Sequence, residues 1–360
     1  MRIDQLVPAF HKGDAIGDTA FHTSRFLRSQ GFQSDIYCLT HDEELSGLAR
    51  PFESFPEPQA GDAVILHFAL PSPLTQAFAR TPARKVLLYH NITPAEFFRP
   101  FSREMERISR LGREELRTLV PHVTLSLADS EFNRRELVEL GFRRTEVFPL
   151  FIDFKKYEKT MSRFVHSLFD DGRLNILFVG RLVPNKKIES LIKVLFYYKK
   201  YISPLVRLII VGKTSSLPKY YESLIRLADS FYLKPEEIYF AGHIPDEELF
   251  ALYRVSDVFL SLSEHEGFGL PFVESMIFDL PVVAYNCTAV PFTMGSGGIL
   301  INDNNEVDRI AELVYSVVHD KDLGSKVIQG QRRRLKAYKE MKLESFLIDL
   351  IKNLRNADWK

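Results

Sequence analysis

The 360-residue sequence has little cysteine, no net charge and no long apolar run. Its two cysteines, Cys38 and Cys287, lie far apart without metal-ligand neighbours, which excludes a disulfide framework and predicts reduced core thiols. Lys plus Arg and Asp plus Glu number 47 each, so no overall charge recruits nucleic acid. No apolar run approaches the roughly 20 residues of a membrane span, and no secretory leader is visible. We therefore expect a cytoplasmic protein, with peripheral contact at the inner face of a membrane left open.

A second absence concerns cofactors. The first predicted strand is not followed by a G-x-G-x-x-G turn, which argues against an enzyme that uses a nicotinamide dinucleotide. The composition, 45% hydrophobic and 26% charged, is that of a globular protein, and the length fits two domains.

Short apolar strands alternate with helical stretches along the whole chain, which predicts two doubly wound parallel sheets. The first set of strands is expected within residues 1–153. The segment 154–173 has no clear period and is interpreted as a linker. The pattern restarts at Leu174 and continues to about residue 338.

The most informative stretch, residues 261–279, combines an apolar strand, a glycine-rich turn and the start of a helix. Gly267 and Gly269 flank Phe268 in this turn, and backbone amides there are suited to phosphate. Glu266 precedes the turn and Glu274 follows it. Two carboxylates would repel an anion bound at this turn. Their presence is explained if they bind hydroxyl groups while the backbone amides bind phosphate.

The pattern Glu266-x7-Glu274 around Gly-Phe-Gly-Leu-Pro resembles the E-x7-E motif of retaining, family-4 type nucleotide-sugar glycosyltransferases. These enzymes have the GT-B fold, in which two Rossmann-like domains face a central cleft; the resemblance implies that residues 1–153 bind the acceptor and residues 174–338 the nucleotide sugar. By this resemblance Glu266 contacts the donor sugar and Glu274 the ribose, and Gly267, Phe268, Gly269 and Leu270 complete the donor site. It also implies that the final helix, residues 339–360, packs back on the N-terminal domain rather than on its own.

A second constellation, Gly180-Arg181 and Lys186, follows the strand that opens the second half. Strand carboxyl ends are where such sheets bind ligands, and two cations there would stabilise a diphosphate and the charge growing on it. The Gly-Arg-x4-Lys spacing is also similar to the same family. Lys187 departs from it, since glycine is common at that position.

Two candidates lie in the first half. His90 ends a predicted strand and is the choice for the histidine that the family places near the reacting sugar; His67, at the end of the neighbouring strand, is its rival. Gly13 occupies the first strand–helix turn and is a candidate donor-binding residue, although the adjacent second glycine of the family is missing.

Arginines recur every three or four residues between Arg99 and Arg117, interleaved with glutamates. A solvated face with i,i+4 pairs explains this pattern, and a contact with an anionic acceptor or membrane is the sharper alternative.

The resemblance implies a metal-independent, retaining hexosyltransferase that uses a nucleotide-diphosphate sugar (a UDP- or GDP-sugar) as substrate and needs no cofactor. The catalytic candidates are His90, Arg181, Lys186 and Glu266. The acceptor is a glycan, a lipid-linked sugar or a small molecule. The alternatives are a nucleotide-sugar 2-epimerase with the same fold and a silent sugar-nucleotide-binding subunit.

Overall fold

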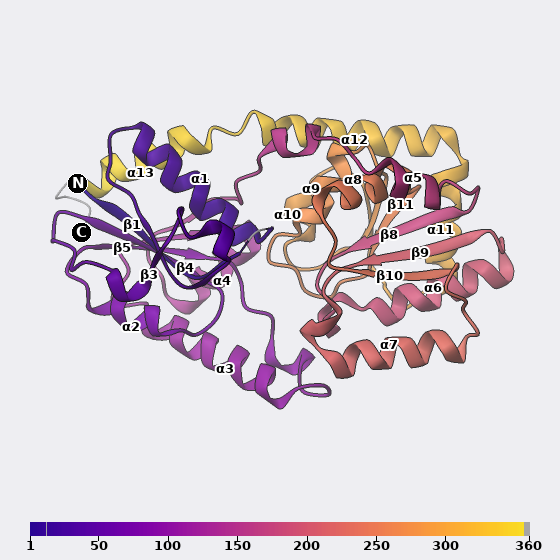
Figure 1. Cartoon of the computed structure of the whole chain (residues 1–360), viewed down its shortest axis with the longest axis horizontal. Coiled ribbons are helices and arrows are strands. Elements are labelled where there is room, and N and C mark those ends of the chain that lie inside the picture. The colour runs from indigo at the N-terminus through magenta and orange to yellow at the C-terminus, as the bar shows by residue number, and fades with distance from the viewer. Residues whose placement is uncertain (12, 356–360) are drawn as a thin grey trace. The chain divides into compact units, whose positions relative to one another are not determined.

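The computed structural model describes residues 1–11 and 13–355. The chain forms two compact units, one made of residues 1–95, 104–152 and 341–360, the other of residues 96–103 and 153–340. Each is an α/β unit around one parallel sheet, as Figure 1 shows. This confirms the predicted fold class of two Rossmann-like doubly wound sheets. No helix in the described part of the chain is long and apolar enough to cross a membrane.

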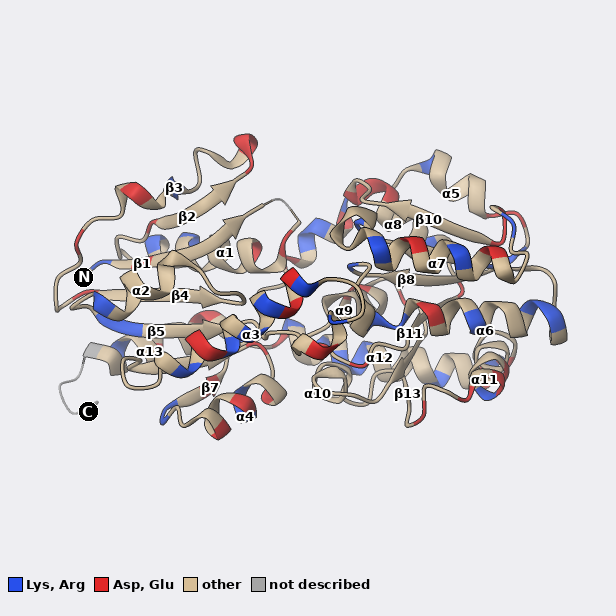
Figure 2. Ribbon diagram, turned by 90° about the horizontal axis from the view of Figure 1, so that it is seen from below, with Lys and Arg blue, Asp and Glu red and all other residues tan. Residues whose placement is uncertain are grey.

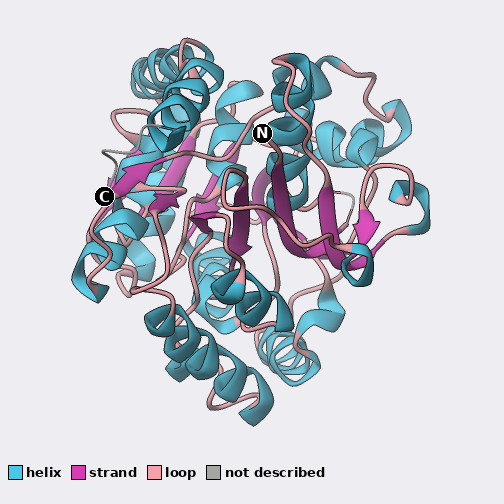
Figure 3. Cartoon of the chain, turned by 90° about the vertical axis from the view of Figure 1, so that its left-hand side faces the viewer, coloured by secondary structure: helices cyan, strands magenta, loops and turns pink. Residues whose placement is uncertain are grey.

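The first unit holds a seven-stranded sheet of order β3-β2-β1-β4-β5-β6-β7. Its strands are β1 (Ile3–Phe10), β2 (Ile36–His41), β3 (Arg50–Pro51), β4 (Ala63–Phe68), β5 (Arg84–Tyr89), β6 (Leu125–Ala128) and β7 (Thr145–Val147). Its helices are α1 (Ala15–Ser29), α2 (Pro73–Arg80), α3 (Arg103–Thr118), α4 (Glu131–Leu140) and α13 (Leu343–Arg355). Helices cover both faces of this sheet (Figure 3).

Alternate residues of β5 divide the first unit's core into two layers. Leu87 and Tyr89 pack on one face with the apolar side chains of α2 and α3. Val86 and Leu88 pack on the other face, where α13 contributes Leu347, Leu350, Ile351 and Leu354. The C-terminal helix therefore belongs to the core of the first unit. Residues 356–360 of the predicted segment 339–360 lie outside the described residues.

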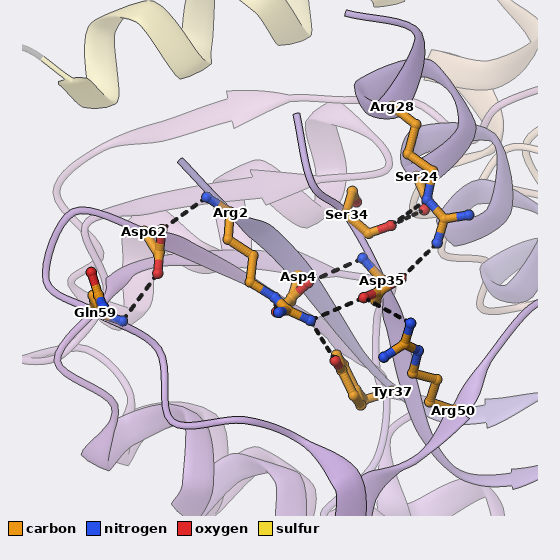
Figure 4. Close-up of polar contacts among 10 residues, drawn as sticks. All are labelled: Arg2, Asp4, Ser24, Arg28, Ser34, Asp35, Tyr37, Arg50, Gln59 and Asp62. Atoms are coloured by element: carbon orange, nitrogen blue, oxygen red, sulfur yellow. Dashed lines mark hydrogen bonds and ion pairs between the residues drawn. The ribbon is translucent and has the colours of Figure 1, made fainter. Parts of the chain in front are cut away.

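A polar network closes the amino-terminal edge of this sheet (Figure 4). The Arg2 guanidinium donates to Asp4, to Asp35 at 2.9 Å and to the Tyr37 hydroxyl at 2.6 Å. Arg28 donates to the same Asp35 at 2.8 Å. Because the Asp4 side chain is buried, the cation of Arg2 compensates a charge that would otherwise destabilise the edge.

The second unit holds a six-stranded sheet of order β10-β9-β8-β11-β12-β13. The strands are β8 (Leu174–Val179), β9 (Val206–Val211), β10 (Ile238–Gly242), β11 (Val258–Ser261), β12 (Val282–Tyr285) and β13 (Ile299–Ile301). The helices are α5 (Arg163–Phe169), α6 (Ile188–Tyr201), α7 (Pro218–Ser230), α8 (Asp246–Val255), α9 (Leu270–Ile277), α10 (Val290–Met294), α11 (Val307–His319) and α12 (Lys321–Lys339).

The segment 154–173, interpreted from the sequence as a linker, is folded within the second unit. It contains the short 3-10 helix η4 (Phe154–Glu158) and helix α5. The Tyr157 ring is buried against Phe250 of α8, with ring centroids 5.4 Å apart. Burial of apolar side chains such as Tyr157 holds this segment in the second unit. Hydrophobic periodicity does not reveal such burial over so short a stretch.

Candidate functional site

The strand order of the second unit reverses direction between β8 and β11. Loops that follow two such strands leave the carboxyl edge of the sheet in opposite directions and open a crevice between them. We call residues 180–187 the β8 loop and residues 262–269 the β11 loop. Both predicted constellations of this half therefore lie at the topological switch point.

The β8 loop is a tight turn that displays two cations. Its backbone closes through hydrogen bonds from Val183 N to Arg181 O at 3.0 Å and from Lys186 N to Val183 O at 2.9 Å. The Arg181 side chain is exposed and forms no ion pair with any other residue of the described ranges. Lys187 is left-handed, with φ +51°, which accounts for the glycine common at this position in the resembled family.

Lys186 and Glu266 join the two loops. Lys186 Nζ lies 2.6 Å from Glu266 Oε2, and the two side chains are 14% and 9% exposed. Glu266 N donates to Thr288 Oγ1 at 2.8 Å, and that hydroxyl donates to Glu266 O at 2.9 Å, so the glutamate is held by its backbone as well. Lys186, which is expected to bind a diphosphate, thus contacts Glu266, which is expected to bind a sugar.

Glycines set the backbone of this edge. Gly269 is the N-cap of α9 with φ +84°, and a Cβ there would lie 2.5 Å from the buried ring of Phe272. Its helix begins without a side-chain cap, and Pro271 has no N–H. Because Phe272 N donates to Gly269 O at 3.1 Å, Leu270 N is the first-turn amide suited to a ligand. Gly212, which follows β9, was missed by the sequence analysis. A Cβ on it would lie 1.9 Å from Gly180 O, so only glycine fits beside the β8 loop.

Glu274, on α9, is buried, and two phenols donate hydrogen bonds to its carboxylate. Tyr157 Oη donates to its Oε1 at 3.0 Å and Tyr253 Oη to its Oε2 at 2.8 Å. Burial raises the pKa of Glu274, and the two hydrogen bonds oppose that rise by favouring the carboxylate. Neither tyrosine was identified from the sequence. Tyr253 lies on α8 and Tyr157 in the segment interpreted as a linker, so no motif spacing connects them to Glu274.

The predicted residues of the first unit form a separate arrangement. Gly13 has φ +77° and precedes Asp14, which caps α1 by accepting from Ile16 N at 3.3 Å. Lys12 beside it lies outside the described residues.

His90 belongs to a buried hydrogen-bonded chain with Gln5, His67 and Asp129. Gln5 Nε2 donates to Ala20 O at 2.8 Å, so its Oε1 accepts from His67 Nε2, also at 2.8 Å. Burial and the neighbouring His90 hold the pKa of His67 well below its usual value, so His67 Nδ1 accepts from His90 Nε2 at 3.0 Å. His90 Nδ1 faces the Asp129 carboxylate at 3.0 Å. Both ring nitrogens are thus engaged inside the unit, and the His90 side chain is 2% exposed.

Within residues 1–11 and 13–355, no three His, Cys, Asp or Glu side chains are placed to hold a metal ion.

The part of the chain that contains this site matches a known protein family. Residues 162–335 match the model of the family "Glycosyl transferases group 1", a range that contains both loops and Glu274. The O-antigen chain mannosyltransferase B of Escherichia coli is 24% identical over 341 residues, covering 88% of this chain and 79% of that protein. The serotype-specific mannosyltransferase WbdA of Escherichia coli is 30% identical over 139 residues, 38% of this chain. The chain spans only 17% of the length of WbdA.

A solved structure extends the likeness to the whole fold. HepE of Anabaena, in complex with UDP-glucose, superposes with a TM-score of 0.74 at 18% identity, covering 98% of each chain. The chain therefore has the GT-B fold, as the resemblance implied.

Proposed function

We propose that this chain is a retaining glycosyltransferase of the family-4 type that moves a hexosyl unit from a nucleotide-diphosphate sugar to a glycan, lipid-linked or small-molecule acceptor without a metal. One observation carries the proposal. The β8 and β11 loops bring Lys186 to within 2.6 Å of Glu266 at the switch point, beside the exposed Arg181 and inside the range that matches the family model.

Each residue then has a role that its surroundings support. Arg181, exposed and without an ion-pair partner among the described residues, neutralises the diphosphate. Lys186 is shared between that diphosphate and Glu266, which binds sugar hydroxyls. The amides of Gly269 and Leu270 at the start of α9 assist with phosphate. Glu274 accepts from the ribose.

The reaction is proposed to retain configuration by departure and attack on the same face of the sugar. The bond from the anomeric carbon to the diphosphate breaks, the acceptor oxygen attacks that carbon, and the leaving phosphate takes the acceptor proton. Arg181 and Lys186 stabilise the charge that develops on the phosphate. His90, with both ring nitrogens engaged by His67 and Asp129, positions the end of β5 and does not transfer the proton.

Mannose is the first sugar to test, since WbdA and the O-antigen chain mannosyltransferase B are named mannosyltransferases, while HepE was solved with UDP-glucose. A thermal-shift panel of UDP, GDP and ADP sugars identifies the nucleotide. A donor at about 100 times its Kd should add about 2.7 kcal/mol, which raises the melting temperature by several degrees. No shift with any sugar nucleotide would contradict the proposal.

Turnover with the donor so identified then tests the mechanism. The one-bond C1–H1 coupling of the product should show the configuration of the donor, and EDTA should leave the rate unchanged. Arg181→Ala should lower kcat more than it weakens nucleotide binding, because its cation acts mainly on charge that develops in the transition state. Arg226→Ala, on the exposed face of α7, is the control. Equal losses in kcat and binding would remove Arg181 from the assigned role.

A further inference from the structure

A second feature of the second unit is a groove of about 800 Å³ between residues 99–103 and the start of α7. Its charged lining residues are Arg99, Arg103 and Lys219, and no acidic side chain within residues 1–11 and 13–355 lines it. Phe101 and Leu217 supply an apolar wall. A concave surface that combines three cations with apolar side chains concentrates positive potential at a place where an anion can be partly desolvated.

Two of the three cations at this groove, Arg103 and Lys219, have no ion-pair partner among the described residues. Both side chains are exposed. The first turn of α7 contains no acidic residue, and the side chain of its N-cap residue, Leu217, accepts no hydrogen bond from the helix. Lys219 therefore lies at the positive end of the helix dipole, where a cation is unfavourable. An arrangement that breaks a local stability rule in this way is expected at a functional site. Opposite charges interleave elsewhere on α3 and α7, as Figure 2 shows.

The groove shares its walls with the candidate donor site. The Phe101 ring packs edge-on against Tyr220, with centroids 5.1 Å apart. Tyr220 Oη accepts from Ile188 N at 3.1 Å, and Ile188 directly follows the β8 loop. At the other end of the same segment, the Phe97 ring lies 6.4 Å from that of His265, the neighbour of Glu266. Residues 96–103 thus run from the β11 loop to the groove.

We propose that this groove binds a phosphate group of the acceptor, one that carries an apolar chain beside the phosphate. The inference rests on the proposed function, because it places the acceptor next to the donor loops. Arginine guanidinium groups match phosphate oxygens in geometry as well as charge, and Phe101 and Leu217 accommodate the apolar part.

The test is a calorimetric titration with farnesyl phosphate, with uncharged farnesol as the matched probe. It is run with the donor site filled by the nucleoside diphosphate that raises the melting temperature most, and without nucleotide if none does. Arg103→Gln combined with Lys219→Gln should weaken farnesyl phosphate binding by about tenfold or more, the loss expected for two charge-assisted contacts. The control, Lys193→Gln with Arg226→Gln, removes the same charge from exposed positions outside the groove and should bind within about twofold of the wild type. A cooperative melting transition in both double variants establishes that both are folded.

Each outcome has a defined meaning. Farnesyl phosphate binding that is equal in the wild type and the groove variant, or farnesol binding as tightly as farnesyl phosphate, overturns the inference. Sedimentation with phosphatidylglycerol vesicles that depends on Arg103 and Lys219, without binding of farnesyl phosphate, also overturns it and assigns the groove to a membrane surface. Because these titrations need no turnover, they are distinct from failure of the proposed function, which appears as absence of sugar-nucleotide binding and transfer in the wild type.

Discussion

The ion pair between Lys186 and Glu266 is expected to stabilise the second unit as well as bind substrate. Replacing Lys186 by methionine keeps most of the side-chain volume but leaves the Glu266 carboxylate, 9% exposed, without its cation. Removing one partner of a buried pair costs about 3–5 kcal/mol. Because both side chains retain slight exposure, we expect about 3 kcal/mol, which lowers the melting temperature of a unit of this size by about 6–12 °C.

A double-mutant cycle by differential scanning calorimetry isolates the pair. Lys186→Met with Glu266→Gln leaves no uncompensated charge, so the double variant should lie within about 1 kcal/mol of the wild type. The control is Lys336→Met, which breaks the exposed pair with Glu340 in the same unit and should cost less than about 0.5 kcal/mol. A loss below about 1 kcal/mol for Lys186→Met, or strict additivity in the double variant, would refute the reasoning.

Other consequences follow from crowding and burial. Gly212→Ala should cost more than about 3 kcal/mol by thermal melting, because its Cβ would lie 1.9 Å from Gly180 O; a normal melting curve would contradict this. Burial raises the pKa of Cys38 to about 11 and of Cys287 to about 12, so native protein at pH 8 should react slowly with Ellman's reagent, and denatured protein fast at both thiols. Burial also raises the pKa of Glu274 above its unfolded value, so its ionisation destabilises the fold as pH rises through the folded pKa. Glu274→Gln should therefore melt higher than the wild type at pH 7, with the gap closing toward pH 4.5; a gap that widens on acidification would contradict this.

The parts of this site that the sequence predicted depend on one property of parallel sheets. Every strand of such a sheet ends at the same edge, so a loop after β8 and a loop after β11 must lie near each other once the strand order is right. Arg181, Lys186 and Glu266 could be assigned to that edge for this reason. Continuous apolar runs likewise predicted most of the strands, because both faces of the sheets are buried.

What the sequence did not predict depends on side-chain contacts across long separations. Tyr157 reaches Glu274 from a stretch without periodicity. The two-residue strand β3 is shorter than any pattern can resolve, and residues 96–103 join the second unit although their flanks belong to the first. The last strand of the first sheet, β7, has only the three residues Thr145–Val147. In each case packing decides, and packing has no local signal.

The surroundings of Glu274 restrict what its carboxylate can bind. An ionised carboxylate offers about four acceptor positions, and the phenols of Tyr157 and Tyr253 occupy two of them. The free positions accept hydrogen bonds only, so a ligand group must be a donor, such as the two hydroxyls of a ribose. The hydrogen bonds of the two phenols also oppose part of the rise in the pKa of Glu274 that burial causes. They therefore favour the ionised form of Glu274 and fix its orientation before any ligand arrives, which is the preorganisation that a hydroxyl-binding site needs.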